Sequence, residues 1–163
     1  MDALNLFGNL ASISGISLKN GMQLFGKKIK ATAEPPNEQE ELKPEIAFVV
    51  EVTRNVMPDV KKYIQKRSMN ASIIHVTTPE DESQLDADMR EDWHDFIREF
   101  SRIMEGVQQQ ISPRKTHIFI SAPASLALGI GCTIGNVKRP HIYHYDNKTQ
   151  SYKLVIIADN ELR

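Results

Sequence analysis

The run Ile46-Ala-Phe-Val-Val-Glu-Val52 constrains the fold more than any other part of the sequence. It has the length of a strand, it is rich in β-branched residues, and it is almost continuously apolar instead of alternating. A strand of this kind is covered on both faces, which is typical of a parallel sheet with helices on both sides. A chain of 163 residues is long enough for one such domain and a short appendage.

The segments that follow alternate between helical and strand patterns, and the clearest is a helix in which large apolar residues recur every three or four positions from Leu85 to Ile111. The expected helices are 57–67, 79–111 and 123–134, and the expected strands are 46–52, 71–76, 116–121, 141–145 and 152–158. The short turn at 146–150 makes the last two strands an antiparallel hairpin. The order β-α-β-α-β-α-β-β predicts a Rossmann-like, three-layer open α/β sheet, mostly parallel, that holds ligands at the carboxyl ends of its strands.

The N-terminal part of the chain has a different composition. Residues 1–30 repeat apolar groups mostly at helical spacing but contain four glycines and end in Lys27, Lys28 and Lys30. They are predicted to form an amphipathic arm that folds onto this domain or a partner, and weak docking on an anionic membrane surface is the less favoured alternative. Residues 31–44, with three prolines and four glutamates, are predicted to be a linker, so the domain spans 45–163.

Charge and cysteine content exclude several classes of protein. A formal net charge of −1 argues against binding to long nucleic acid, although residues 112–163, with seven basic and three acidic side chains, leave room for a small anion. The single cysteine, Cys132, excludes a disulfide framework and a cysteine-rich metal site, and we expect it to be buried. With neither a secretory signal nor a membrane-span pattern, a cytoplasmic location is expected.

The candidate ligand site begins where the strand 116–121 turns directly into a helix. With Pro123 at the first helical position, Ala122 becomes the cap residue and offers no side-chain oxygen to the first amides. Those amides, with the Ser121 and Ser125 hydroxyls, suit a phosphate, and bound water is the alternative occupant.

Other candidate residues follow from topology. Thr53 and Arg54 end the first strand at the same edge as Ser121 and Tyr145, so Arg54 is either a cation for the ligand or part of a surface ion pair, and Tyr145 could stack on a base. The adjacent Lys138 and Arg139 are either further phosphate ligands or a solvated loop.

Signatures of catalysis are poor. The sequence has no Gly-x-Ser-x-Gly elbow, no phosphate loop and no His-Glu-x-x-His helix. His141 and His144 point to opposite faces of a strand, so no metal site is predicted. A hydrolase that uses Ser121 or Ser125 is the weakest hypothesis, because no base is identifiable.

The stretch Thr116–Ala158 carries a strand, a proline, a small-residue helix with glycines, and an aromatic strand that leads into a hairpin. In this order the stretch resembles the C-terminal part of SAVED domains, while residues 44–114 match only in topology. The resemblance implies a sensor for cyclic oligonucleotide second messengers in bacterial antiphage signalling or type III CRISPR defence, with no other cofactor. The family's pocket edge falls on Thr53, Arg54, Ser121, Ala122, Pro123 and Tyr145.

The resemblance also implies a partner. SAVED domains contain two Rossmann-like halves and are fused to an effector domain, whereas this chain is expected to supply one half and no effector. We therefore expect a homo-oligomer, or a hetero-oligomer with an effector-bearing subunit, which is non-catalytic or has at most weak ring-nuclease activity. An exposed sheet edge also favours a neighbour. The alternative is a structural adaptor without a ligand, whose N-terminal arm recruits a partner or a membrane.

Overall fold

The computed structural model describes residues 17–19, 23–25, 28–34, 45–79, 85, 90–137 and 139–158. In these ranges the strands are β1 (Ser17–Lys19), β2 (Gln23–Phe25), β3 (Lys30–Glu34), β4 (Glu45–Glu51), β5 (Ala71–Thr77), β6 (Lys115–Ser121), β7 (Pro140–Asp146) and β8 (Ser151–Ile157). The helices are α2 (Met57–Lys66), α3 (Arg90–Ile111), α4 (Ala124–Thr133) and the 3₁₀ turn η1 (Ile134–Asn136).

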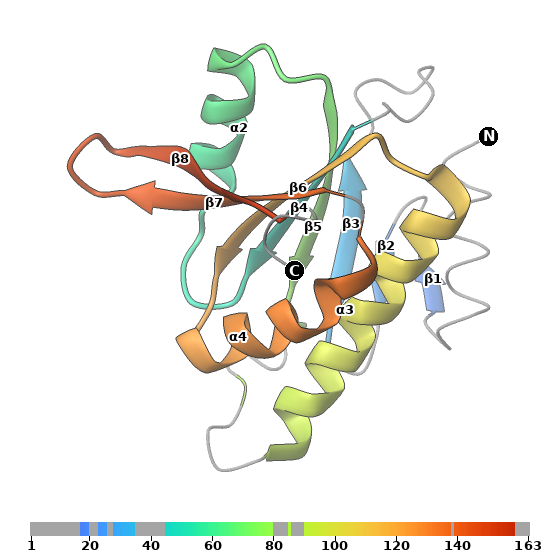
Figure 1. Cartoon of the computed structure of the whole chain (residues 1–163). Helices are drawn as coiled ribbons and strands as arrows, with labels where there is room; N and C mark the ends of the chain where they lie inside the picture. Colours follow the sequence, from blue (N-terminus) through green and yellow to red (C-terminus); the bar gives the residue numbers. More distant parts are fainter. Residues whose placement is uncertain are drawn as a thin grey trace.

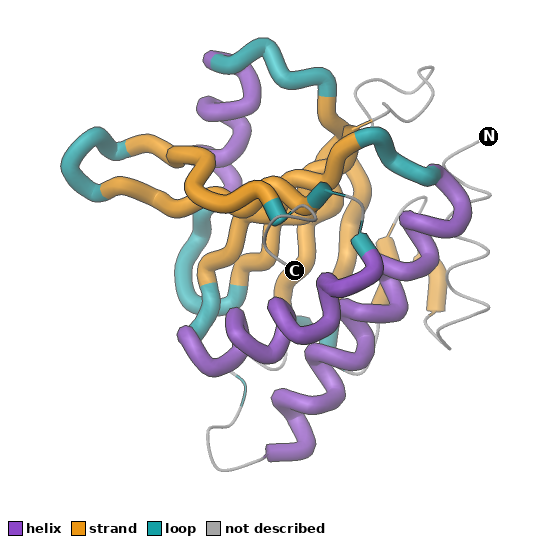
Figure 2. The backbone as a smooth tube through the Cα atoms, in the orientation of Figure 1, coloured by secondary structure: helices purple, strands orange, loops and turns teal. Residues whose placement is uncertain are grey.

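All described strands belong to one sheet with the order β1-β2-β3-β5-β4-β6-β7-β8. Its centre, β5-β4-β6-β7, is parallel, and β7 and β8 form the predicted antiparallel hairpin. Helix α2 covers one face, and α3 and α4 cover the other (Figures 1 and 2). The Rossmann-like three-layer architecture predicted from the sequence is therefore confirmed.

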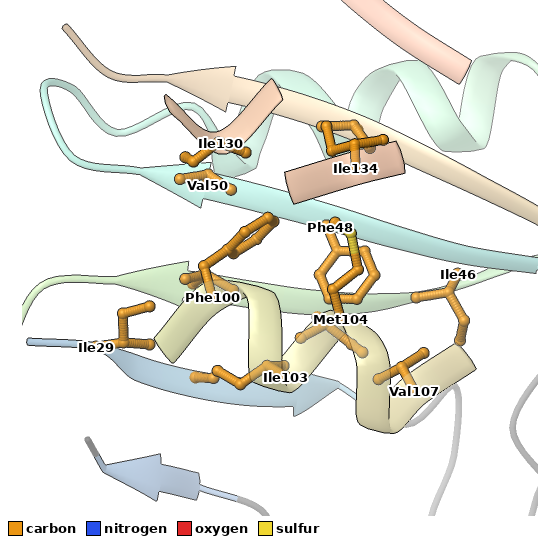
Figure 3. Packing of buried hydrophobic residues seen from close by; sticks show 14 of the residues in the cluster. Ile29, Ile46, Phe48, Val50, Phe100, Ile103, Met104, Val107, Ile130 and Ile134 are labelled. Atoms are coloured by element: carbon orange, nitrogen blue, oxygen red, sulfur yellow. The ribbon is translucent and has the colours of Figure 1, made fainter. Parts of the chain in front are cut away.

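The position of β4 explains its continuous apolarity. Ile46, Phe48 and Val50 face α3 and α4, whereas Ala47 and Val49 face α2, and all five are buried. On the first face the Phe48 and Phe100 rings meet edge to face, with centroids 5.8 Å apart, among the side chains shown in Figure 3. Burying one such phenylalanine contributes about 1.5–3 kcal/mol to folding.

The opposite face is aromatic. Tyr63 of α2 packs on Phe119, Tyr143 and Tyr152, and the Phe119 and Tyr143 rings stack with centroids 4.3 Å apart. The carboxylate of Glu51 accepts hydrogen bonds from the first amides of α2, those of Val56 (2.9 Å) and Met57 (3.2 Å). This cap holds the loop between β4 and α2, from which two of the candidate site residues come.

The structure differs from the predicted boundary between linker and domain. Lys30–Glu34 pairs with β5 as an antiparallel strand, and Ala31 and Ala33 are buried in the core. Lys28 is only 7% exposed, and its ammonium lies 3.2 Å from Asp92 of α3. Residues 30–34 therefore extend the sheet, because the small apolar side chains of Ala31 and Ala33 alternate toward α3. Residues 1–16 and 35–44 of the predicted arm and linker lie outside the described residues.

One prediction about α4 needs correction, because Cys132 is exposed, not buried. The two glycines of this helix differ in their surroundings. A Cβ on Gly129 would overlap the Ile97 side chain of α3, whereas nothing lies within 4 Å of a Cβ on Gly131. Among the described helices, none combines the length and apolarity needed to span a bilayer.

Candidate functional site

The candidate site lies where the sheet changes direction. From β4 the chain crosses over through α2 to β5, and β6 lies on the other side of β4, so the carboxyl ends of β4 and β6 meet at a topological switch point, where open α/β sheets bind ligands. Glu51 and Ser121 are direct neighbours at this end. Of the residues predicted for the site, those at the carboxyl ends of β4 and β6 are brought together here.

Thr53 and Ser121 lie next to each other at this edge of the sheet. The Val52 and Thr53 amides both donate to the Ser121 carbonyl, at 2.8 and 3.0 Å, so the loop continues the strand pairing for two more residues. The Thr53 and Ser121 hydroxyl oxygens are 2.9 Å apart and share one hydrogen bond. One of the two protons is consequently left to donate outward, which suits an anionic oxygen.

Arg54 lies over Tyr145. Its guanidinium carbon is 4.5 Å from the centre of the ring, which is itself braced edge to face by Tyr152 at 5.2 Å. Arg54 is exposed and forms no ion pair with any described residue. The geometry thus favours a cation available to a ligand over the predicted alternative of a surface ion pair.

The amino end of α4 differs by one residue from the prediction. Pro123 is the cap residue, with φ −54° and ψ 144°, so Ala122 lies before the cap and packs half-buried against the core. The physical conclusion is retained, because proline has neither a side-chain acceptor nor an amide N–H, and the Pro123 side chain makes no capping hydrogen bond. The first amides of α4, including that of exposed Ser125, face the same edge as Thr53 and Ser121.

Acidic groups near this edge are already engaged. Glu51 caps α2 and lies 3.6 Å from the buried His75 Nε2. Hydrogen bonds from Lys153, Thr149 and the Lys148 amide lower the pKa of Asp146 to about 2. In the described part of the chain no three His, Cys, Asp or Glu side chains gather into a group that could hold a metal ion.

Arg139 does not belong to this site. β7 runs parallel to β6 and begins with Pro140 beside Thr116, so Arg139 lies at the amino ends of the strands. The distance from there to Ser121 is about 17 Å along the strand. The predicted grouping with Arg54 is therefore wrong, and the order of elements alone could have corrected it, because a residue before a parallel strand lies at the opposite edge. Lys138 lies outside the described residues.

The sequence analysis missed a buried polar network at the amino edge. The Tyr143 hydroxyl donates to His117 Nδ1 (2.8 Å), and His117 Nε2–H donates to Glu45 (3.0 Å), because a carboxylate can only accept. Lys115 lies 3.2 Å from the other Glu45 oxygen. Burial lowers the pKa of His117, although the hydrogen bond to Glu45 acts in the opposite direction. Burial alone would raise the pKa of Glu45, but its bonds to His117 and Lys115 lower it. Only the strand register aligns these residues.

The comparison with family models identifies one family. Residues 25–157 match the model of SAVED, the SMODS-associated and fused to various effectors sensor domain. Two solved structures of the Acinetobacter baumannii Cap4 SAVED/CARF-domain containing receptor, with the cyclic trinucleotides 3'3'3'-cAAA and 2'3'3'-cAAA, resemble this fold with TM-scores of 0.61 and 0.62. Sequence identity to them is 17% and 15% over 82% and 83% of this chain, which spans 28% and 27% of the receptors. A search of curated proteins found no match.

Proposed function

The chain belongs to the SAVED family of sensor domains, and we propose that it binds a cyclic oligonucleotide second messenger and relays its presence in bacterial antiphage signalling. The observation that carries this proposal is the convergence of Thr53, Arg54, Ser121, Tyr145 and the uncapped start of α4 at one edge of the sheet. Hydroxyls, a guanidinium and free helix amides suit phosphates, and the tyrosine offers an aromatic surface to a base.

The ring size of the cyclic oligonucleotide is the next question. The Cap4 receptors of similar fold are described with cyclic trinucleotides. We therefore take a cyclic triadenylate as the first probe and include cyclic di- and tetranucleotides. A ring of any of these sizes carries more than one phosphate, whereas this edge offers one unpaired arginine among the described residues.

We propose that the remaining contacts come from a second copy of this chain or from a subunit that carries an effector. One edge of the sheet supports this. Among the described strands β8 is the last in the sheet, and its Leu154, Val155, Ile156 and Ile157 are 42%, 53%, 43% and 41% exposed. Four consecutive exposed apolar residues on an edge strand favour an interface.

We propose that sensing occurs without catalysis. Thr53 and Ser121 hydrogen bond to each other, and among the described residues neither hydroxyl is hydrogen bonded to a histidine or a carboxylate. Glu51, the nearest strand-end acid, is occupied by the amides of α2. The adaptor alternative has less support, because Lys28 of the predicted arm is buried in the domain. Chromatography of the messenger after incubation tests for ring opening, and a linear product would contradict this part of the proposal.

Thermal unfolding against the messenger panel tests the main proposal. A ligand that binds only the native state stabilises it by about 2.7 kcal/mol at a hundredfold excess over its dissociation constant. We expect one ring size to raise Tm, and light scattering with that ligand to report a larger assembly.

Variants locate the effect. Arg54→Ala is expected to weaken binding about tenfold, since it removes a charge-assisted contact to phosphate. The matched control is Arg98→Ala, because Arg98 is an exposed arginine of α3 that pairs with Asp95 at 2.9 Å, away from the site. Unchanged affinity in an Arg54→Ala, Tyr145→Ala double variant, or no response to any ring size, would refute the proposed function.

A further inference from the structure

A second pocket lies at the opposite edge of the sheet, where the parallel strands begin. It has a volume of about 310 Å³ and is lined by Arg114, Lys115, Arg139, His141 and Ile157. β6 and β7 start side by side here (Figure 1). Apart from the isoleucine, every lining side chain is a cation or an imidazole.

The cations of this pocket differ in how far they are neutralised. Lys115 is paired with Glu45, which itself accepts the bond from His117. Arg114 and Arg139 are exposed and form no ion pair with any described residue. Two guanidiniums are therefore left beside one hollow, and each presents the planar fork of donors that fits phosphate oxygens.

The backbone holds Arg139 and His141 in place. Arg139 has a φ of 48°, an unfavourable conformation for a side chain with a Cβ. Its carbonyl accepts a hydrogen bond of 2.8 Å from His141 Nδ1, so His141 Nε2 takes no part in that bond. The His141 ring is also braced by the buried His117 ring, with centroids 5.4 Å apart.

We propose that this pocket binds the phosphate group of a small phosphomonoester or diphosphate, as a site separate from the one at the carboxyl edge. Its size suits a phosphate or diphosphate with part of its substituent, and its lining offers donors from three basic side chains. Glu45, the acid that pairs with the pocket's Lys115, is also compensated by His117. The site does not depend on the proposed cyclic oligonucleotide.

The first experiment titrates the full chain with pyrophosphate, adenosine 5'-monophosphate and adenosine by calorimetry. The arginine Nε–Hε and histidine ring signals are followed in parallel by NMR. We expect saturable binding of the two phosphate compounds, no binding of adenosine, and shifts of the Arg114, Arg139 and His141 signals. Pyrophosphate and the monophosphate separate a bare phosphate ligand from a phosphomonoester. Adenosine binding as tightly as its monophosphate, or shifts confined to Arg54, would overturn the proposal.

The second experiment uses Arg139→Gly, which removes the cation and relieves the positive φ at the same time. The variant should fold at least as stably as the parent protein, so a loss of binding cannot be attributed to unfolding. We expect binding to weaken about tenfold or more in Arg139→Gly and in Arg114→Gln.

Arg102→Gln is the control for diffuse charge, because Arg102 is exposed on α3 and does not line the pocket. Its effect should stay below about twofold. An equal loss in all three variants would indicate an adventitious ion only and would refute the proposal.

Discussion

Removing the hydroxyl of Tyr143 tests whether the buried network at the amino edge stabilises the sheet. In Tyr143→Phe the ring keeps its stacking on Phe119 at 4.3 Å and its edge contact with Tyr63 at 5.5 Å, so little apolar packing is lost. His117 is 4% exposed, and its Nδ1 loses the hydroxyl that donates to it at 2.8 Å. Leaving a buried acceptor unsatisfied costs about 1–3 kcal/mol.

The assay is urea denaturation followed by circular dichroism. We expect a free energy of unfolding lower by about 2 kcal/mol with an unchanged m value, and Tm lower by about 4–8 °C, from roughly 2–4 °C per kcal/mol for a chain of this size. Tyr152→Phe is the matched control. Tyr152 belongs to the same cluster and is 3% exposed, but its hydroxyl makes no hydrogen bond to a described residue.

A double-mutant cycle with His117→Phe separates the hydrogen bond from general packing. Without the imidazole, the Tyr143 hydroxyl has no acceptor at this position, so the second substitution should cost clearly less than it does in the parent protein. Equal losses in Tyr143→Phe and Tyr152→Phe, or additive losses in the cycle, would refute the view that this bond stabilises the domain.

Three further predictions concern pH, the cap of α2 and the glycines of α4. Burial lowers the pKa of His117, so as pH decreases the unfolded chain binds a proton on this imidazole before the folded protein does. The free energy of unfolding should therefore fall as pH decreases below about 6.5. Urea melts at several pH values should lose this dependence in His117→Gln. Glu51→Gln should lower the free energy of unfolding by about 1 kcal/mol, because it removes the charge that accepts the first α2 amides, and a change below a few tenths in urea melts would contradict this. Gly131→Ala should raise the free energy of unfolding by about 0.5–1 kcal/mol, since the new Cβ meets open space. Gly129→Ala should raise it less, because the Ile97 side chain must move. Calorimetric Tm values in the reverse order would contradict the packing of α4 on α3.

The sequence was sufficient to predict features that depend on composition within a segment. A continuously apolar β4 requires cover on both faces, and the spacing of large residues in α3 requires a single buried stripe, so the layers follow. Thr53, Arg54, Ser121 and Tyr145 follow from topology, because the ends of adjacent parallel strands meet at one edge. For these residues, local pattern and global fold agree.

Features that depend on pairing between distant segments could not be predicted in this way. β3 is short, and its Ala31 and Ala33 become a core only when β5 lies beside them, so composition alone suggests a linker. His117 and Glu45 are 72 residues apart and meet only because β4 and β6 pair in the observed register, with Glu45 beside Lys115. A polar residue within an apolar strand is the available signal, and it does not identify its partner.

The separation of the two edges follows from the same pairing. β4, β6 and β7 run parallel from the pocket with Arg139 at their amino ends to the candidate site with Arg54 at their carboxyl ends. A ligand small enough for one edge cannot reach across about 17 Å of strand to the other. Two anions held at opposite ends of the same strands would therefore be bound by separate residues, and substitutions at either edge should leave the affinity of the other unchanged, apart from weak long-range electrostatics that salt screens.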